Sequence, residues 1–187
     1  SNFTPRSSKL YEQHKSANFL PSKGIVNFGL QGFIKWFLID IFNEGFFNKP
    51  KQEVIDYYRK RMDTSLGENA VTMEHIEELH DLGYLPIEIK SLPEGVVSPI
   101  GVPVFSIKNT LPEFFWITNY LETVLISGLW KSYTNATIAY DYRRILEYFY
   151  FNTDSPKELI DLMCHDFSAR GTGTPYDATM NGASHLL

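Results

Sequence analysis

The sequence has a single cysteine, Cys164, among its 187 residues, and it contains no Cys-x-x-Cys motif. It therefore lacks both a disulfide framework and the ligands of a structural zinc site, and it fits the reducing cytoplasm best. No basic segment followed by an apolar stretch opens the sequence, so no secretion signal is expected. Because the first residue is not methionine, we expect a segment of a longer chain.

Positive charge is also scarce. The formal net charge is −5 and the isoelectric point is about 5.5, so nucleic-acid binding through the phosphate backbone is not expected. The richest apolar stretch, residues 25–47, is interrupted by Asn27, Gln31, Lys35 and Asp40. It is too polar for a membrane span and is interpreted as a buried helix.

Hydrophobic residues make up 43% of the chain, enough for one core or for two small lobes. Apolar residues at helical spacing predict helices over 30–41, ending at Gly45, over 53–62, and over 72–82 with Thr72 as N-cap and Gly83 after the last turn. Short β-branched runs between Pro and Gly predict two or three strands within 85–110.

The second half of the sequence is again typical of helices. Thr110 and Glu113 form a capping-box pattern that predicts a helix to about Gly128, and a further helical segment follows at 138–149. A similar device at 155–158 predicts a short helix ending near Met163. The order of helix, strands and helices predicts an α+β fold with two lobes.

Three familiar motifs, a zinc-binding helix, a dinucleotide-binding fingerprint and a P-loop, are not matched by the sequence. His75 and His80 are five residues apart, which turns the second ring about 140° away from the first on a helix, so the two cannot share one metal. The sequence GTGTPY at 171–176 lacks the third glycine of a dinucleotide-binding fingerprint, and no P-loop pattern is present.

The segment HDFSARGTG at 165–173 combines an acid, an aromatic ring, an arginine and two glycines. We predict a strand over 164–167, a glycine loop, and the start of a helix at 181–187, which together would cradle an anion. Arg170 offers a planar fork for phosphate, and Phe167 offers a flat face for a ring. In the alternative interpretation, Phe167 is a core residue, Arg170 is a surface charge and the glycines only turn the chain.

Five segments in the same order resemble the nicotinamide phosphoribosyltransferase family: FGLQGF, LPIEIKSLPEGVVSPIG, NTLPEFFWITNYLET, HDFSARG and GASHL. The resemblance implies synthesis of nicotinamide mononucleotide from nicotinamide and phosphoribosyl pyrophosphate, with Mg²⁺ assisting the departure of pyrophosphate. It also implies a homodimer in which the two subunits share their sites.

The resemblance further implies roles for four residues. Phe167 stacks on nicotinamide, Arg170 reaches the substrate as a catalytic and binding residue, and His165 lines the same pocket or only bonds to loop backbone. The opening SNFTPRSSK is similar to a family segment whose arginine reaches pyrophosphate in the partner's site, which carries over to Arg6. That match is looser, and a solvated terminal charge is the alternative for Arg6.

The implied fold is the N-terminal part of a type II phosphoribosyltransferase. Residues 11–110 form a helix-plus-sheet lobe, while 1–10 and 111–187 begin an irregular α/β barrel domain. Other family site residues fall outside this sequence, so we expect the chain alone to be inactive. The alternatives are the related nicotinate enzyme, and a non-catalytic binding or assembly module derived from the family.

Overall fold

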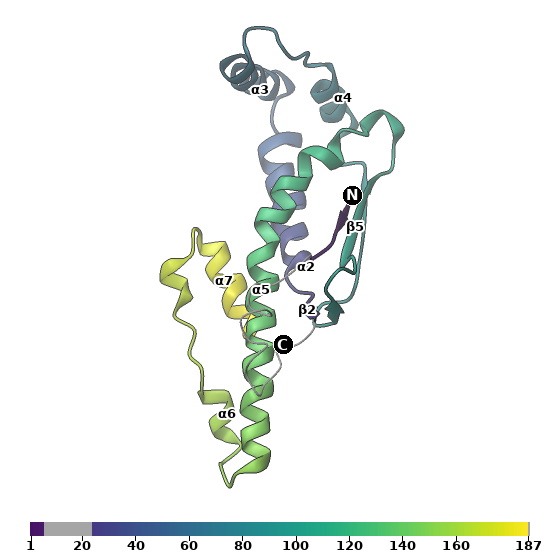
Figure 1. Cartoon of the computed structure of the whole chain (residues 1–187). Coiled ribbons are helices and arrows are strands. Elements are labelled where there is room, and N and C mark those ends of the chain that lie inside the picture. Colours follow the sequence, from purple (N-terminus) through teal and green to yellow (C-terminus); the bar gives the residue numbers. More distant parts are fainter. Residues whose placement is uncertain (6–23, 187) are drawn as a thin grey trace.

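The computed structural model describes residues 1–5 and 24–186. Its longest element is helix α5 (Ile117–Asn152, 36 residues), which runs through most of the elongated molecule (Figure 1). Helices α3 and α4 lie at one end of α5, and α6 lies at the other end (Figure 1). The mixture of helices with small sheets agrees with the expected α+β class.

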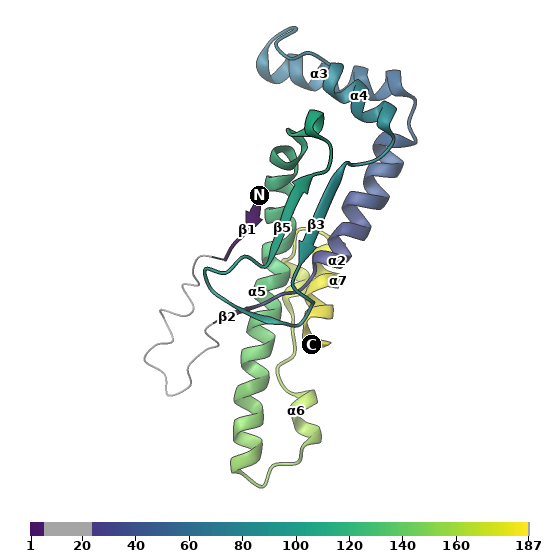
Figure 2. The same cartoon turned by 90° about the vertical axis from the view of Figure 1, so that its right-hand side faces the viewer.

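Two small antiparallel sheets lie beside α5 (Figure 2). The first has the order β1 (Asn2–Phe3), β5 (Phe105–Asn109) and β3 (Ile87–Ser91), and the second pairs β2 (Gly24–Val26) with β4 (Val97–Pro99). The strands expected within 85–110 are therefore confirmed. The pairing of β1 with β5 brings the first residues of the chain into the same sheet.

The first long helical region continues past the predicted end at Gly45. It consists of α2 (Leu30–Phe33) and two segments of wider π-helical turns, η1 (Ile34–Ile41) and η2 (Asn43–Phe47). Gly45 lies inside the second of these, with open space where a Cβ would be. The helical region ends at Asn48, where the approaching Pro50 disfavours further helix.

Helices α3 (Lys51–Leu66) and α4 (Glu74–Leu82) confirm the next two predicted helices. Gly83 ends α4 in the left-handed region at φ 81°, as expected for a residue that closes a helix. The predicted cap at Thr72 is wrong, because the N-cap position is occupied by Met73 and no side chain caps the helix.

The two helices predicted on either side of Gly128 are one continuous helix, α5. Gly128 does not end it but packs against Phe33: a Cβ at this position would lie 2.2 Å from the ring. The capping box at Thr110 does not form either. A short 3₁₀ turn, η3 (Pro112–Phe114), precedes α5, and the Thr110 N–H donates to the carbonyl of Pro86 at 2.7 Å.

The main core lies where α2 and η1 meet β5 and α5. Its buried side chains, all at most 7% exposed, include Leu30, Phe33, Leu38, Val104, Phe105, Ile107, Leu121, Leu125, Leu129 and Tyr133. A smaller cluster of Ile55, Met73 and Ile76 joins α3 to α4. The long helix is therefore held by one face against the sheet and α2.

The C-terminal segment differs most from the prediction. Helix α6 (Glu158–Leu162) starts without a side-chain cap, and the hydroxyl of Ser155 lies 2.8 Å from that of Thr153 instead. Residues 164–167 do not pair with any described strand, so the predicted strand is wrong. A short 3₁₀ helix, η4 (Ser168–Gly171), follows, then α7 (Pro175–Ala183) and η5 (Ser184–Leu186).

Candidate substrate-binding loop

The segment 165–173 forms the connection between α6 and α7, alongside α5 (Figure 1). Cys164, just before it, adopts a left-handed backbone conformation with φ 62°. Extended strands require a negative φ, so this residue helps to explain why 164–167 is not a strand. The candidate site is a compact loop rather than the end of a sheet strand.

Helix α7 is seated on α2 and α5 through small residues. A Cβ at Gly32 would lie 3.3 Å from the Met180 side chain of α7, and one at Gly29 would lie 3.2 Å from the same side chain. Lys131 of α5 also forms an ion pair with Asp177 of α7 at 3.2 Å. These contacts fix the helix that follows the loop.

The helix after the loop begins earlier than predicted. The Thr174 hydroxyl oxygen accepts from the Asp177 N–H at 3.1 Å, and Pro175 is the first helical residue. The stretch from Asn181 to Leu186 therefore holds the end of α7 and the short 3₁₀ helix η5, and no α-helix starts there. The expected anion cradle of a strand, a glycine loop and a helix start is therefore not formed, because 164–167 is not a strand and no α-helix starts at Asn181. The first turn of α7 also carries an acid, Asp177.

Phe167 and Arg170 are brought together on the loop. Phe167 is the residue before the 3₁₀ helix and Arg170 is its third residue, and side chains three apart eclipse each other in this helix type. The guanidinium carbon of Arg170 lies 5.7 Å from the centre of the Phe167 ring. Phe167 is 68% exposed, so in this chain it is not the core residue of the alternative interpretation.

Asp166 of the loop lies near His185 of η5, the short turn after α7, and motif spacing did not single out either residue as a site residue. The Nδ1–H of His185 donates to the carbonyl of Asn181 at 2.9 Å, while Nε2 lies 3.9 Å from a carboxylate oxygen of Asp166. Asn181 itself is buried. The motif GASHL contains the histidine, but only the fold places it against the acid.

His165 faces a different environment from Phe167 and Arg170. It lines an open groove of about 1290 Å³ between the second half of α5 and the segment from α6 to Asp166. Arg143 and Glu147 of α5 also line this groove, and Arg143 is held by ion pairs to Glu147 and Asp161. The structure thus groups two of the predicted site residues and places His165 on the groove side of the loop.

A buried polar network connects two further segments of the resemblance, FGLQGF and LPEG. Asn27 is fully buried, donates to the carbonyls of Leu92 and Pro93, and accepts a hydrogen bond from the Tyr133 hydroxyl. The Glu94 carboxylate accepts from the N–H groups of Gly29 at 2.7 Å and Gln31 at 3.0 Å. These residues hold the start of α2, on which α7 rests.

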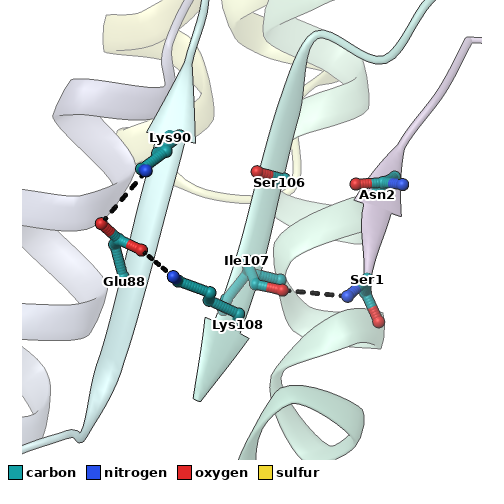
Figure 3. Close-up of a pocket in the computed structure, with 7 residues that line it drawn as sticks. All are labelled: Ser1, Asn2, Glu88, Lys90, Ser106, Ile107 and Lys108. Carbon is teal, nitrogen blue, oxygen red and sulfur yellow. Dashed lines mark hydrogen bonds and ion pairs between the residues drawn. The ribbon is translucent and has the colours of Figure 1, made fainter. Parts of the chain in front are cut away.

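A second hollow, of about 290 Å³, lies on the open face of the first sheet (Figure 3). The carboxylate of Glu88 points between Lys90 and Lys108, at 3.5 Å and 2.7 Å (Figure 3). The hydrogen bond from Lys108 is the main reason that the pKa of Glu88 is lowered. Since Glu88 offsets charge from both lysines and no residue of the loop lies there, this hollow is not the candidate site.

The remaining predictions concern metal, membrane and Arg6. Within residues 1–5 and 24–186, no group of three or more His, Cys, Asp or Glu side chains is arranged to hold a metal ion. In the same part of the chain, no helix combines the length and apolar character needed to cross a membrane. Arg6 lies outside the described residues, so its predicted role is not addressed by the structure.

Comparison with known proteins gives a consistent set of relatives. The chain is 54% identical over 187 residues to a nicotinamide phosphoribosyltransferase of Acinetobacter baylyi, covering 99% of this chain and 36% of that protein. Proteins of the same name from Xanthomonas campestris and Mycoplasma pneumoniae are 37% identical over 106 residues and 32% identical over 104 residues. These two alignments cover 56% and 54% of this chain, and 22% and 23% of the relatives. No family model matches.

Proposed function

Because the chain belongs to the nicotinamide phosphoribosyltransferase family, of whose Acinetobacter member it spans about a third of the length, we propose that it is part of an NAD-salvage enzyme. This enzyme forms nicotinamide mononucleotide and pyrophosphate from nicotinamide and phosphoribosyl pyrophosphate. The full-length enzyme carries this chain as one of its segments. The observation that carries the proposal is the pairing of Phe167 with Arg170 on the loop of the matching segment.

The reaction sets the requirements for the site. The pyridine nitrogen of nicotinamide supplies the electron pair of a new bond to C1 of the ribose, and the bond from C1 to the pyrophosphate oxygen breaks. The ribose becomes positively charged at C1 and the leaving group gains negative charge. Catalysis therefore needs precise placement of the ring and cations on the pyrophosphate, and it needs no protein nucleophile.

Phe167 and Arg170 meet these two requirements. The exposed phenyl face stacks on the nicotinamide ring, and the guanidinium binds donor phosphate through two parallel hydrogen bonds. His165 contributes from the groove side of the same loop, and Arg6 contributes phosphate contacts in the partner's site. Asp166 and His185 keep the loop against α7, so they act as positioning residues.

Magnesium enters this proposal with the pyrophosphate group. The described residues do not offer a cluster of metal ligands, and Mg²⁺ is commonly held by substrate phosphates, water and one or two carboxylates. Its proposed contribution is to offset charge on the leaving pyrophosphate.

The finer fold and the assembly are also proposals. We place the chain at the N-terminal part of a type II phosphoribosyltransferase, with 11–110 as a lobe and the remainder as the start of a barrel. The full-length enzyme is a cytoplasmic homodimer with shared sites. Subunit mixing tests the sharing: Arg6→Ala enzyme mixed with enzyme inactivated at Phe167 should regain activity after subunit exchange, because one hybrid site keeps both residues. Absence of restoration after verified exchange contradicts the shared site.

Substrate choice separates the proposal from its nearest alternative, a nicotinate enzyme. The relatives compared above are named for nicotinamide, and a carboxylate substrate would favour an additional cation at the ring. We expect kcat/KM of the full-length enzyme to be higher for nicotinamide than for nicotinate. Product formed from nicotinate alone, or from neither compound by folded enzyme, contradicts the proposal.

The role of Arg170 has its own test. Arg170→Lys keeps the charge but loses the planar fork, so kcat falls and any loss of binding concentrates on the phosphoribosyl donor. Arg61→Lys, on α3 at the far end of the molecule (Figure 1), is the matched control and leaves both parameters unchanged. Equal kinetics for Arg170→Lys and wild type would remove Arg170 from the site.

A further inference from the structure

The side chains of Phe167 and Arg170 contact each other in this chain. The guanidinium carbon is 5.7 Å from the ring centre, and both side chains are exposed. In the part of the chain that the structure describes, Arg170 forms no ion pair and Phe167 contacts no other aromatic ring. The contact is a cation–π interaction in which the arginine covers one face of the phenyl ring.

A stacked ligand would need the same space. Aromatic rings that pack on each other have centroids about 4.5–7 Å apart, and the guanidinium carbon of Arg170 lies within that range. A pyridine ring and the guanidinium therefore exclude each other on the covered face. Only the opposite face of Phe167 is accessible without moving the arginine.

The chemistry of the reaction selects the covered face. The nicotinamide nitrogen and C1 of the donor have to approach within about 3–3.5 Å for the bond to form. Since Arg170 binds the donor in the proposed function, the donor lies on the side of Phe167 where Arg170 stands. Nicotinamide has to stack on that side as well.

We propose that Arg170 couples the two substrate subsites. Without donor, its guanidinium covers the Phe167 ring and opposes nicotinamide binding. Donor phosphate draws the guanidinium away, and the uncovered ring then binds nicotinamide. This inference rests on the proposed function, and it assigns the coupling between the two subsites to the Arg170 side chain.

The size of the coupling follows from the contact that is exchanged. An exposed cation–π pair corresponds to about a two- to fivefold change in an equilibrium constant. Nicotinamide should therefore bind about two- to fivefold more tightly when the phosphate subsite is filled. By reciprocity, nicotinamide should tighten the binding of the phosphate ligand by the same factor.

The test measures nicotinamide binding to the full-length enzyme by calorimetry, with and without saturating magnesium pyrophosphate. Pyrophosphate fills the phosphate subsite without allowing turnover. For wild type we expect the dissociation constant of nicotinamide to fall about two- to fivefold on adding pyrophosphate.

Arg170→Ala removes the guanidinium that covers the Phe167 ring, so it tests whether Arg170 is responsible for the coupling. This variant should bind nicotinamide without pyrophosphate about as tightly as wild type binds it with pyrophosphate, and pyrophosphate should produce no further tightening. The matched control is Arg61→Ala, which deletes an arginine that lies 5.6 Å from the ring centre of Tyr57 on α3. The control should keep the full wild-type coupling.

The outcomes separate this inference from the proposed function. If wild type binds neither ligand, the proposed function fails and the coupling fails with it. If wild type binds both ligands but pyrophosphate leaves nicotinamide affinity unchanged, the coupling alone is overturned. Weaker nicotinamide binding by Arg170→Ala in the absence of pyrophosphate would overturn it as well, because the arginine would then assist the ring.

Discussion

Gly128 of α5 lies directly against the ring of Phe33 of α2: a Cβ on Gly128 would fall 2.2 Å from Cε2 of that ring. Phe33 is only 1% exposed and packs against neighbouring aromatic rings, so it has little room to shift. The absence of a side chain at position 128 is what allows the two helices to approach. The close approach of α5 to α2 at this point therefore requires glycine at position 128.

Gly128→Ala should therefore destabilise the protein. Alanine improves helix propensity by about 0.8–1 kcal/mol, but overpacking a core costs about 1–3 kcal/mol, so we expect a lower free energy of unfolding in denaturant titration. Gly182→Ala in α7, where a Cβ would meet open space, is the matched control and should be neutral or stabilising. A stabilised Gly128→Ala protein would contradict the close contact.

Glu94 should act as the cap of α2. Its carboxylate accepts from two N–H groups at the start of this helix, and loss of a helix cap costs about 0.5–2 kcal/mol. Glu94→Ala should lower the free energy of unfolding by that amount. Glu113→Ala, at the position of the capping box that does not form, should leave stability within about 0.5 kcal/mol. Equal losses in the two variants would favour the sequence pattern over the structure.

The hydroxyl of Tyr176 should make stability depend on alkaline pH. Burial, and then the charges of Asp177 and Glu94, raises the pKa of Tyr176 to about 12. The folded form therefore holds its proton more tightly than the unfolded form, whose tyrosine pKa is about 10. Its contribution to stability is complete below about pH 10 and is lost as the pH rises towards 12.

Tyr176→Phe should reduce this alkaline loss of stability. Burial also raises the pKa of Tyr58 and Tyr133, so part of the loss should remain. Near neutral pH the substitution should cost little, because the Tyr176 hydroxyl is buried without a hydrogen-bond partner among the described residues. The measurement is the free energy of unfolding from pH 8 to 11, with Tyr57→Phe on an exposed tyrosine as control. Identical curves for wild type and Tyr176→Phe would refute the assignment.

Apolar spacing was sufficient to predict most helices, and β-branched runs between Pro and Gly were sufficient to predict the strands, because both patterns are local in the sequence. These patterns could not decide the role of a glycine. Gly83 ends a helix in a left-handed conformation. Gly128 lies inside a continuous helix, where glycine leaves room for the Phe33 ring of another helix. The same limit applies to Thr110, whose N–H bonds to Pro86, a partner that is not visible from local spacing.

For the candidate site, the motif identified Phe167 and Arg170 but not their geometry. The strand predicted before them covered 164–167, and the left-handed backbone of Cys164, which an extended strand does not allow, could not be foreseen from residue type. The contact between Asp166 and His185 depends on the return of the chain along α7. The motif was sufficient to identify the candidate residues, whereas their arrangement in space became visible only in the folded structure.

The central claim is that the exposed ring of Phe167 binds nicotinamide, and Phe167→Leu in the full-length enzyme tests it most directly. Leucine keeps an apolar side chain but removes the aromatic face, so the KM for nicotinamide should rise about three- to twelvefold. The KM for the phosphoribosyl donor should change much less. Because Phe167 is 68% exposed in this chain, the melting temperature should stay unchanged. A lower melting temperature with an unaltered KM for nicotinamide would contradict the account.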